Sequence, residues 1–202
     1  MKSRWENLVT NRSWESECAS RCWEELEKRY EGAARFYHSF FHIEDCLNQL
    51  GELKLEASSA IELAIWFHDV IYEIDRSDNE AISGDFAVAW LEQLGESAGM
   101  CEAVDRLINA TDHRSASEAM DEQIIVDIDL SILGSEPARY HRYCQQIRAE
   151  YSEIPDEVYR DGRARVLRSF LQRPVIYRSE FYQGLEEPAR ENLVAELSGL
   201  ET

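Results

Sequence analysis

Proline is scarce in this sequence and occurs only in its last third. The first of the four prolines is Pro137, so no residue before it must interrupt a helix. Sustained alternation of apolar and polar residues, the pattern of a half-buried strand, is also missing. Together these absences argue against a sheet protein and favour an all-α fold.

Long apolar runs and paired cysteines are missing as well. No run approaches the length that spans a bilayer, and residues 1–16 lack the apolar core of a signal peptide. The five cysteines are odd in number, and Cys18 and Cys22 have helical spacing rather than that of a CxxC motif. We therefore expect a cytoplasmic protein with reduced thiols and no membrane segment.

Basic residues are half as frequent as acidic ones. Lysine and arginine number 21 against 40 acidic residues, which gives a formal net charge of −19. Proteins that bind long nucleic acids hold the phosphate backbone with clustered basic side chains, so this balance argues against that class. A small phosphorylated substrate stays possible, because a metal ion and a few local arginines can supply positive charge.

Helical periodicity fills most of the chain, and we expect one domain over residues 1–202. Residues 22–50 are expected to form two helices that meet near Gly32. The segment 121–134 is helical by pattern, although its β-branched part could pass for a strand. The other expected helices cover residues 56–74, 77–95, 100–113, 137–154, 156–173 and 188–198.

The segment AIWFHDVIY, residues 64–72, is almost wholly apolar, yet His68 and Asp69 lie at its centre. Burying an ionisable pair costs several kcal/mol unless its members are paired or bind a metal. Two interpretations follow: a hydrogen-bonded pair within the core, or a pair of metal ligands.

Other histidines and acids also stand in apolar segments. His38 and His42 are one helical turn apart in YHSFFHI, and Asp127 and Asp129 interrupt IIVDIDLSIL. If such side chains met at one cation, the acids would be neutralised and the imidazole lone pairs would be used.

This ordered set of residues resembles the HD superfamily of helical, metal-dependent phosphohydrolases. The sequence is similar to a predicted phosphohydrolase group with the motifs YHxxxHI, FHDxxY, NExxS, ATxxH and DxDLxILG. Here they read YHSFFHI, FHDVIY, NEAIS, ATDHR and DIDLSILG, and the resemblance covers residues 20–198. The lysine of the HDxGK form, which can assist at phosphate, is missing from HDVIY.

The resemblance implies one divalent metal site. Its ligands would be His42, His68, Asp69 and Asp129, with Asp129 preferred to Asp127 because it directly precedes a leucine. Oxygen and imidazole ligands suit Mn, Mg, Co, Ni, Fe or Zn.

Further residues are candidates for catalysis or for phosphate binding. Glu80 could orient or deprotonate water, but its spacing from Ser77 also fits a capping box. His113 is the other catalytic candidate for this proton transfer. It is expected near a helix end, where it could face phosphate or a second metal, or act as a cap. The candidates for phosphate binding are Arg35, His38, Asn79 and Arg163, and Arg35 is also a catalytic candidate.

The expected function is hydrolysis of a small phosphate ester or nucleotide by a metal-activated water. Two alternatives are a di-iron oxygenase of the same fold, in which His38 or His113 and Asp127 would hold a second ion, and a non-catalytic helical metal-binding module. The sequence leaves the substrate, the number of ions, the oligomeric state and the pathway open.

Overall fold

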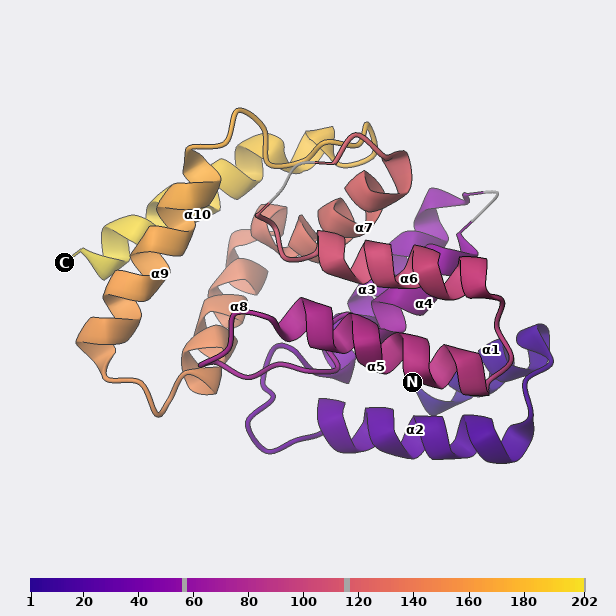
Figure 1. Ribbon diagram of the computed structural model, residues 1–202. Helices are drawn as coiled ribbons and strands as arrows, with labels where there is room; N and C mark the ends of the chain where they lie inside the picture. The colour runs from indigo at the N-terminus through magenta and orange to yellow at the C-terminus, as the bar shows by residue number, and fades with distance from the viewer. Residues whose placement is uncertain (56–57, 115–116, 202) are drawn as a thin grey trace. The chain divides into compact units, whose positions relative to one another are not determined.

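The computed structural model describes residues 1–55, 58–114 and 117–201, and confirms the all-α prediction (Figure 1). These residues form ten α-helices and two short 3₁₀ helices, with no strand among them. The chain divides into two compact units, residues 1–117 and 118–202. The prediction of one domain over the whole chain stays a prediction.

The first unit is built from six helices in which α4 is central. Its residues are apolar almost throughout, and from Leu63 to Phe67 all are buried, so this helix is covered on every side. It contacts α3, α5 and α6, and α5 and α6 lie side by side. The six helices are α1 (Lys2–Arg12), α2 (Ser16–Tyr30), α3 (Phe40–Leu53), α4 (Ser59–Phe67), α5 (Asn79–Gln93) and α6 (Ala98–Ala110).

Tryptophan side chains pack the first two helices against α4. The Trp5 ring meets Trp66 of α4 edge-on at 5.4 Å, and Trp23 of α2 meets the same Trp66 edge-on at 6.4 Å. Aromatic pairs in such geometries contribute beyond their buried area. Helix α1, which was not among the expected helices, is therefore part of the core of this unit.

The second unit contains the remaining helices. Its α10 packs against α9 and against the 3₁₀ turn η1. A Cβ at Gly134 would lie 2.6 Å from the Leu185 Cβ, so glycine permits this close approach. The elements are α7 (Met120–Leu130), η1 (Ser131–Gly134), α8 (Pro137–Glu150), α9 (Asp156–Leu171), η2 (Gln183–Leu185) and α10 (Glu186–Leu200). The ambiguous β-branched segment is thus the helix α7.

Several helices begin or end away from their expected bounds, and two of these differences determine where the candidate site residues lie. The helix expected over residues 56–74 ends at Phe67, and the first two residues of that range lie outside the described residues. The second helix of residues 22–50 begins only at Phe40, so His38 stands in a turn rather than on a helix. The expectation that His38 and His42 lie one turn apart on the same helix is therefore wrong.

The two ends of α5 are closed in different ways. Its N-cap is Asp78 rather than Ser77, and no side chain caps it, so the expected capping box is wrong. At the other end Gly95 has a φ of 86°, and the amides of Gly95 and Glu96 bond to the carbonyls of Glu92 and Leu91. This is a Schellman ending, in which glycine takes the left-handed position.

No helix in the described ranges has the length and the apolar character that crossing a membrane requires.

Candidate metal centre

His42 enters the site from the first turn of α3. Its backbone amide bonds to the carbonyl of Ser39, the N-cap residue, at 3.0 Å. The residue keeps only 3% of its exposure, and the sulfur of Cys46, one turn further along α3, lies 3.7 Å from its ring nitrogens. A histidine so buried needs a partner for each ring nitrogen.

His68 and Asp69 lie at the C-terminal end of α4 rather than within a helix. The amide of His68 closes the last helical turn on Ala64 at 2.9 Å, and Asp69 belongs to the turn that follows. The Val70 amide bonds to the Phe67 carbonyl at 3.1 Å, so His68 and Asp69 are the central residues of a turn that follows the helix.

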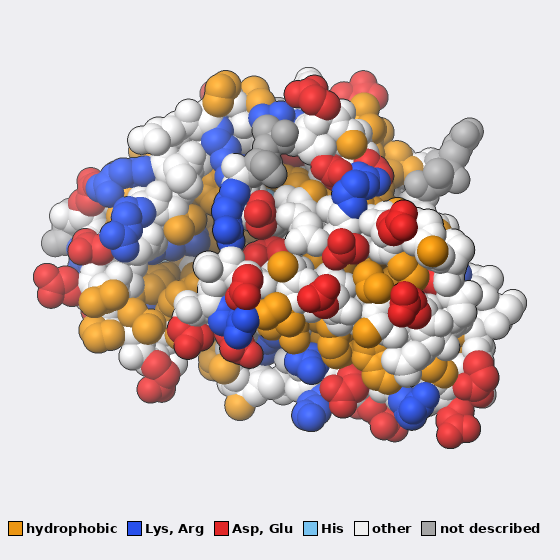
Figure 2. All heavy atoms as spheres, in the orientation of Figure 1, with side chains coloured by type: hydrophobic (Ala, Val, Ile, Leu, Met, Phe, Trp, Pro, Cys, Tyr) orange, Lys and Arg blue, Asp and Glu red, His pale blue; other side chains and the backbone are white. Residues whose placement is uncertain are grey.

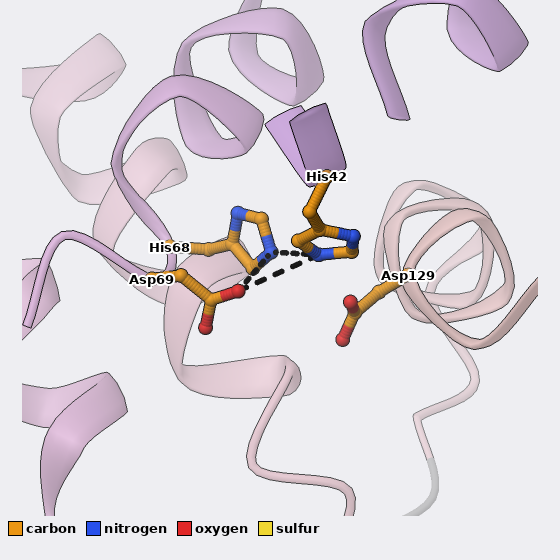
Figure 3. A group of neighbouring side chains, drawn as sticks. All are labelled: His42, His68, Asp69 and Asp129. Carbon is orange, nitrogen blue, oxygen red and sulfur yellow. Dashed lines mark hydrogen bonds and ion pairs between the residues drawn. The ribbon is translucent and has the colours of Figure 1, made fainter. Parts of the chain in front are cut away.

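Three donor atoms of these residues lie close together, as Figure 3 shows. The Nε2 atoms of His42 and His68 are 3.1 Å apart. Oδ2 of Asp69 lies 3.2 Å from the His68 nitrogen and 3.4 Å from the His42 nitrogen. Atoms that share a tetrahedral ion at about 2.1 Å would be about 3.4 Å apart, so the spacing suits a common cation.

A backbone bond indicates which His68 nitrogen carries the proton. Nδ1 of His68 lies 3.0 Å from the carbonyl oxygen of Ile65. A carbonyl only accepts, so Nδ1 is the donor, and in the neutral ring Nε2 offers its lone pair to the site. Histidine ligands of metals are typically oriented in this way.

The carboxylate of Asp69 has the character of a ligand. Its Oδ2 is buried and receives no hydrogen bond from the described part of the chain, although both ring nitrogens lie within 3.4 Å. Burial raises the pKa of this carboxyl, but the rings of His68, His38 and His42 outweigh burial and hold the pKa well below its ordinary value. The oxygen is thus held ionised beside two imidazoles, and this donor set fits a divalent ion.

The stacked rings of His38 and Tyr72 lie beside these residues. Their rings stack with centroids 3.8 Å apart, and the His38 ring lies 6.0 Å from that of His42. The sequence motifs contain Tyr72, but no role was predicted for it. The predicted contact between His38 and phosphate stays a prediction.

The guanidinium of Arg35 donates its hydrogen bonds to backbone carbonyls. Its Nη1 donates to the carbonyls of His38 at 2.9 Å and Asp69 at 2.7 Å, and its Nη2 donates to that of Val70 at 3.1 Å. The predicted phosphate and catalytic roles of Arg35 stay predictions, and its observed bonds are structural.

Glu80 and Asn79 begin α5, and their environments differ. Burial, followed by the nearby charge of Asp69, raises the pKa of Glu80 above its ordinary value of 4.5, although His113 and Arg114 lower it. Asn79 instead exchanges two hydrogen bonds with the backbone of Glu73, at 3.1 and 3.0 Å. Glu80 is therefore suited to proton transfer, whereas Asn79 has a structural bond at each end of its amide.

His113 follows the end of α6, as the sequence predicted. It has a φ of 58°, a left-handed conformation that is uncommon outside glycine. The next residue, Arg114, donates to the carbonyl of Ser77 just before α5. The predicted catalytic role of His113 stays a prediction.

Asp127 and Asp129 lie on α7 of the second unit, and Asp127 has a structural role. It is fully buried and accepts hydrogen bonds from the amides of Arg178, at 3.1 and 3.0 Å, and Ser179, at 2.7 Å. Burial raises the pKa of Asp127 even so. The second ion of the oxygenase alternative would need this carboxylate, which already holds the segment after α9. Asp129, also drawn in Figure 3, is half-buried, and its predicted role as a ligand stays a prediction.

Arg163, the last predicted phosphate ligand, also belongs to the second unit. Its guanidinium pairs with Glu196 at 2.8 Å, and the two side chains keep only 9% and 10% of their exposure. The hydroxyl of Tyr143 lies 3.3 Å from it as well. Binding phosphate would break a buried ion pair, which is costly, so Arg163 is not part of the function proposed below.

A scan against models of known protein families found no match to this chain, and neither did searches of curated proteins and of solved structures.

Proposed function

We propose that the chain is a metal-dependent phosphohydrolase that acts on a small phosphate ester or nucleotide. The observation that carries the proposal is the meeting of two imidazole nitrogens and one carboxylate oxygen within 3.4 Å, with the proton of His68 directed to the Ile65 carbonyl. His42, His68 and Asp69 would hold one divalent ion. Asp129, by the resemblance to HD phosphohydrolases, would supply the fourth ligand.

A bound divalent ion would lower the pKa of water and polarise a phosphoryl oxygen. Glu80 would accept the proton of the attacking water at its carboxylate, a role that its raised pKa favours. His38 and His113 would donate to phosphate oxygens as negative charge develops. Because His42 and His68 are buried, their rings cannot turn away into solvent.

The first test is the metal content of protein purified without chelator. Wild type is expected to carry about one divalent ion per chain, and Asp69→Ala is expected to carry none. Asp85→Ala is the matched control, because Asp85 is exposed on α5 and loses the same side chain atoms. Thermal unfolding should show that the Asp69→Ala protein stays folded.

Activity is then measured on phosphate esters and nucleotides with Mn²⁺, Co²⁺, Ni²⁺ and Mg²⁺. Hydrolysis by wild type and Asp85→Ala, together with its loss in Asp69→Ala, is the expected result. An Asp69→Ala protein with full metal content or full activity would contradict the proposal. Protein that binds no metal even after addition would leave His68 and Asp69 as a hydrogen-bonded pair.

A further inference from the structure

The guanidinium of Arg35 connects two segments that are far apart in the sequence. Arg35 lies between α2 and α3, on the segment that leads to His42. It donates to the His38 carbonyl on its own segment and to the carbonyls of Asp69 and Val70 on the turn after α4. The two ligand histidines that these segments carry are 26 positions apart in the sequence.

Aromatic rings hold this guanidinium in place. Its central carbon lies 5.7 Å from the ring centroid of Tyr30 and 5.5 Å from that of Tyr72. Tyr72 in turn stacks on His38. Cations over aromatic rings are attracted by the ring electrons. The two tyrosine rings therefore help to hold the Arg35 side chain, in addition to its hydrogen bonds.

The turn after α4 depends on such contacts from outside. Helix α4 stops without glycine or proline, and the carbonyls of Asp69 and Val70 point to Arg35 rather than to a further helical turn. Backbone carbonyls that are shielded in part from water need donors, and the Arg35 side chain donates to carbonyls of both segments. Moving the turn would move Asp69 relative to His42.

We propose that Arg35 is a positioning residue, which sets the spacing between His42 and the His68–Asp69 pair through the backbone. This inference rests on the metal site proposed above, and it gives Arg35 a role without contact to the ion or the substrate. Its planar guanidinium presents several donors in fixed directions, whereas a lysine ammonium is a compact charge on a flexible stem. Lysine should therefore replace it only in part.

The experiment compares Co²⁺ binding by wild type, Arg35→Met, Arg35→Lys and Arg190→Met. Arg190 is the matched control, because it donates to the carbonyls of Leu171 and Arg173 in the second unit. Arg35→Met should raise the Kd for Co²⁺ about 10- to 100-fold, as the loss of outer contacts does at other metal sites. Arg35→Lys should lie between that variant and wild type, and Arg190→Met should stay within about twofold of wild type.

A second measurement does not depend on metal. In chelator, the amide hydrogens of residues 68–72 should exchange faster in Arg35→Met than in wild type or Arg190→Met, at equal helix content by circular dichroism. Unchanged Co²⁺ affinity in Arg35→Met, or unchanged exchange there, would overturn the positioning role. If wild type bound no Co²⁺, the proposed metal site would fail, and exchange alone would then decide whether Arg35 ties the two segments. Should Arg35→Met not fold, the same comparisons are made with Arg35→Lys.

Discussion

At the scale of single residues, candidate side chains are distinguished by the hydrogen bonds that they already make. Asn79 is paired at both ends of its amide, and Asp127 is surrounded by backbone amides. In His68, by contrast, Nδ1 donates to the Ile65 carbonyl and Nε2 faces the carboxylate of Asp69. His68 is thus suited to act as a metal ligand, because its Nδ1 already has a hydrogen-bond partner and its Nε2 faces the candidate site.

Glu80 permits a test of proton transfer at this scale. Its pKa is raised above 4.5, so its carboxylate form is populated only at higher pH than usual. Activity should therefore rise with pH as this group loses its proton. Glu80→Gln should lower kcat by about 10²- to 10⁴-fold and remove this acidic limb of the pH profile.

The metal content of Glu80→Gln should equal that of wild type, which separates the loss of a base from the loss of the site. The measurements are steady-state rates across pH and elemental analysis of the same samples. A variant whose acidic limb is unchanged would assign that limb to another group and remove Glu80 from the mechanism.

At the scale of elements, the candidate site is assembled from helix ends. His42 is in the first turn of α3, His68 is at the end of α4, Glu80 is in the first turn of α5, and His113 follows α6. The sequence predicted that these helices exist, because apolar periodicity is a local property. It did not predict where α4 ends, because the turn is held by Arg35 and by the Ser83 hydroxyl, which accepts the Ile71 amide at 3.1 Å.

The proximity of His42, His68 and Asp69 was easier to predict than their surroundings. The three were singled out because ionisable residues in an apolar segment need an explanation, and the ordered motifs supplied one. The stack of Tyr72 on His38 and the carbonyl contacts of Arg35 depend on distant segments meeting, and no local pattern encodes that.

Helix α7 provides a prediction at the element scale. Asp127→Ala would leave the buried amide of Ser179 and the neighbouring amide of Arg178 without their acceptor. We expect a loss of about 2–4 kcal/mol in the free energy of unfolding, measured by urea denaturation in chelator. The folded Asp127→Ala protein should still carry its ion.

Asp129→Ala, two positions along the same helix, is the comparison. It should change stability less than Asp127→Ala does in chelator, and it should lower metal content or affinity. If Asp127→Ala lost the ion while Asp129→Ala kept it, the assignment of the two carboxylates would be reversed.

At the scale of the whole molecule, the dominant property is the charge of −19. On the face seen in Figure 2, acidic side chains are spread over the surface among basic and apolar ones. A field of one sign repels long polyanions. The proposed site would therefore rely on local groups, the ion with His38 and His113, to attract phosphate.

The same charge should make stability depend on salt. Like charges at this excess repel one another more in the compact state than in the unfolded chain, and salt screens that repulsion. Raising NaCl from about 10 mM to about 150 mM shortens the screening length from about 30 Å to about 8 Å, so the Tm in chelator should rise by a few degrees. KCl should have the same effect if screening is the cause, whereas a rise with only one of the salts would indicate specific ion binding. A Tm that falls with both salts would show that attractive ion pairs, such as Arg12–Glu96 at 3.1 Å, outweigh the net repulsion.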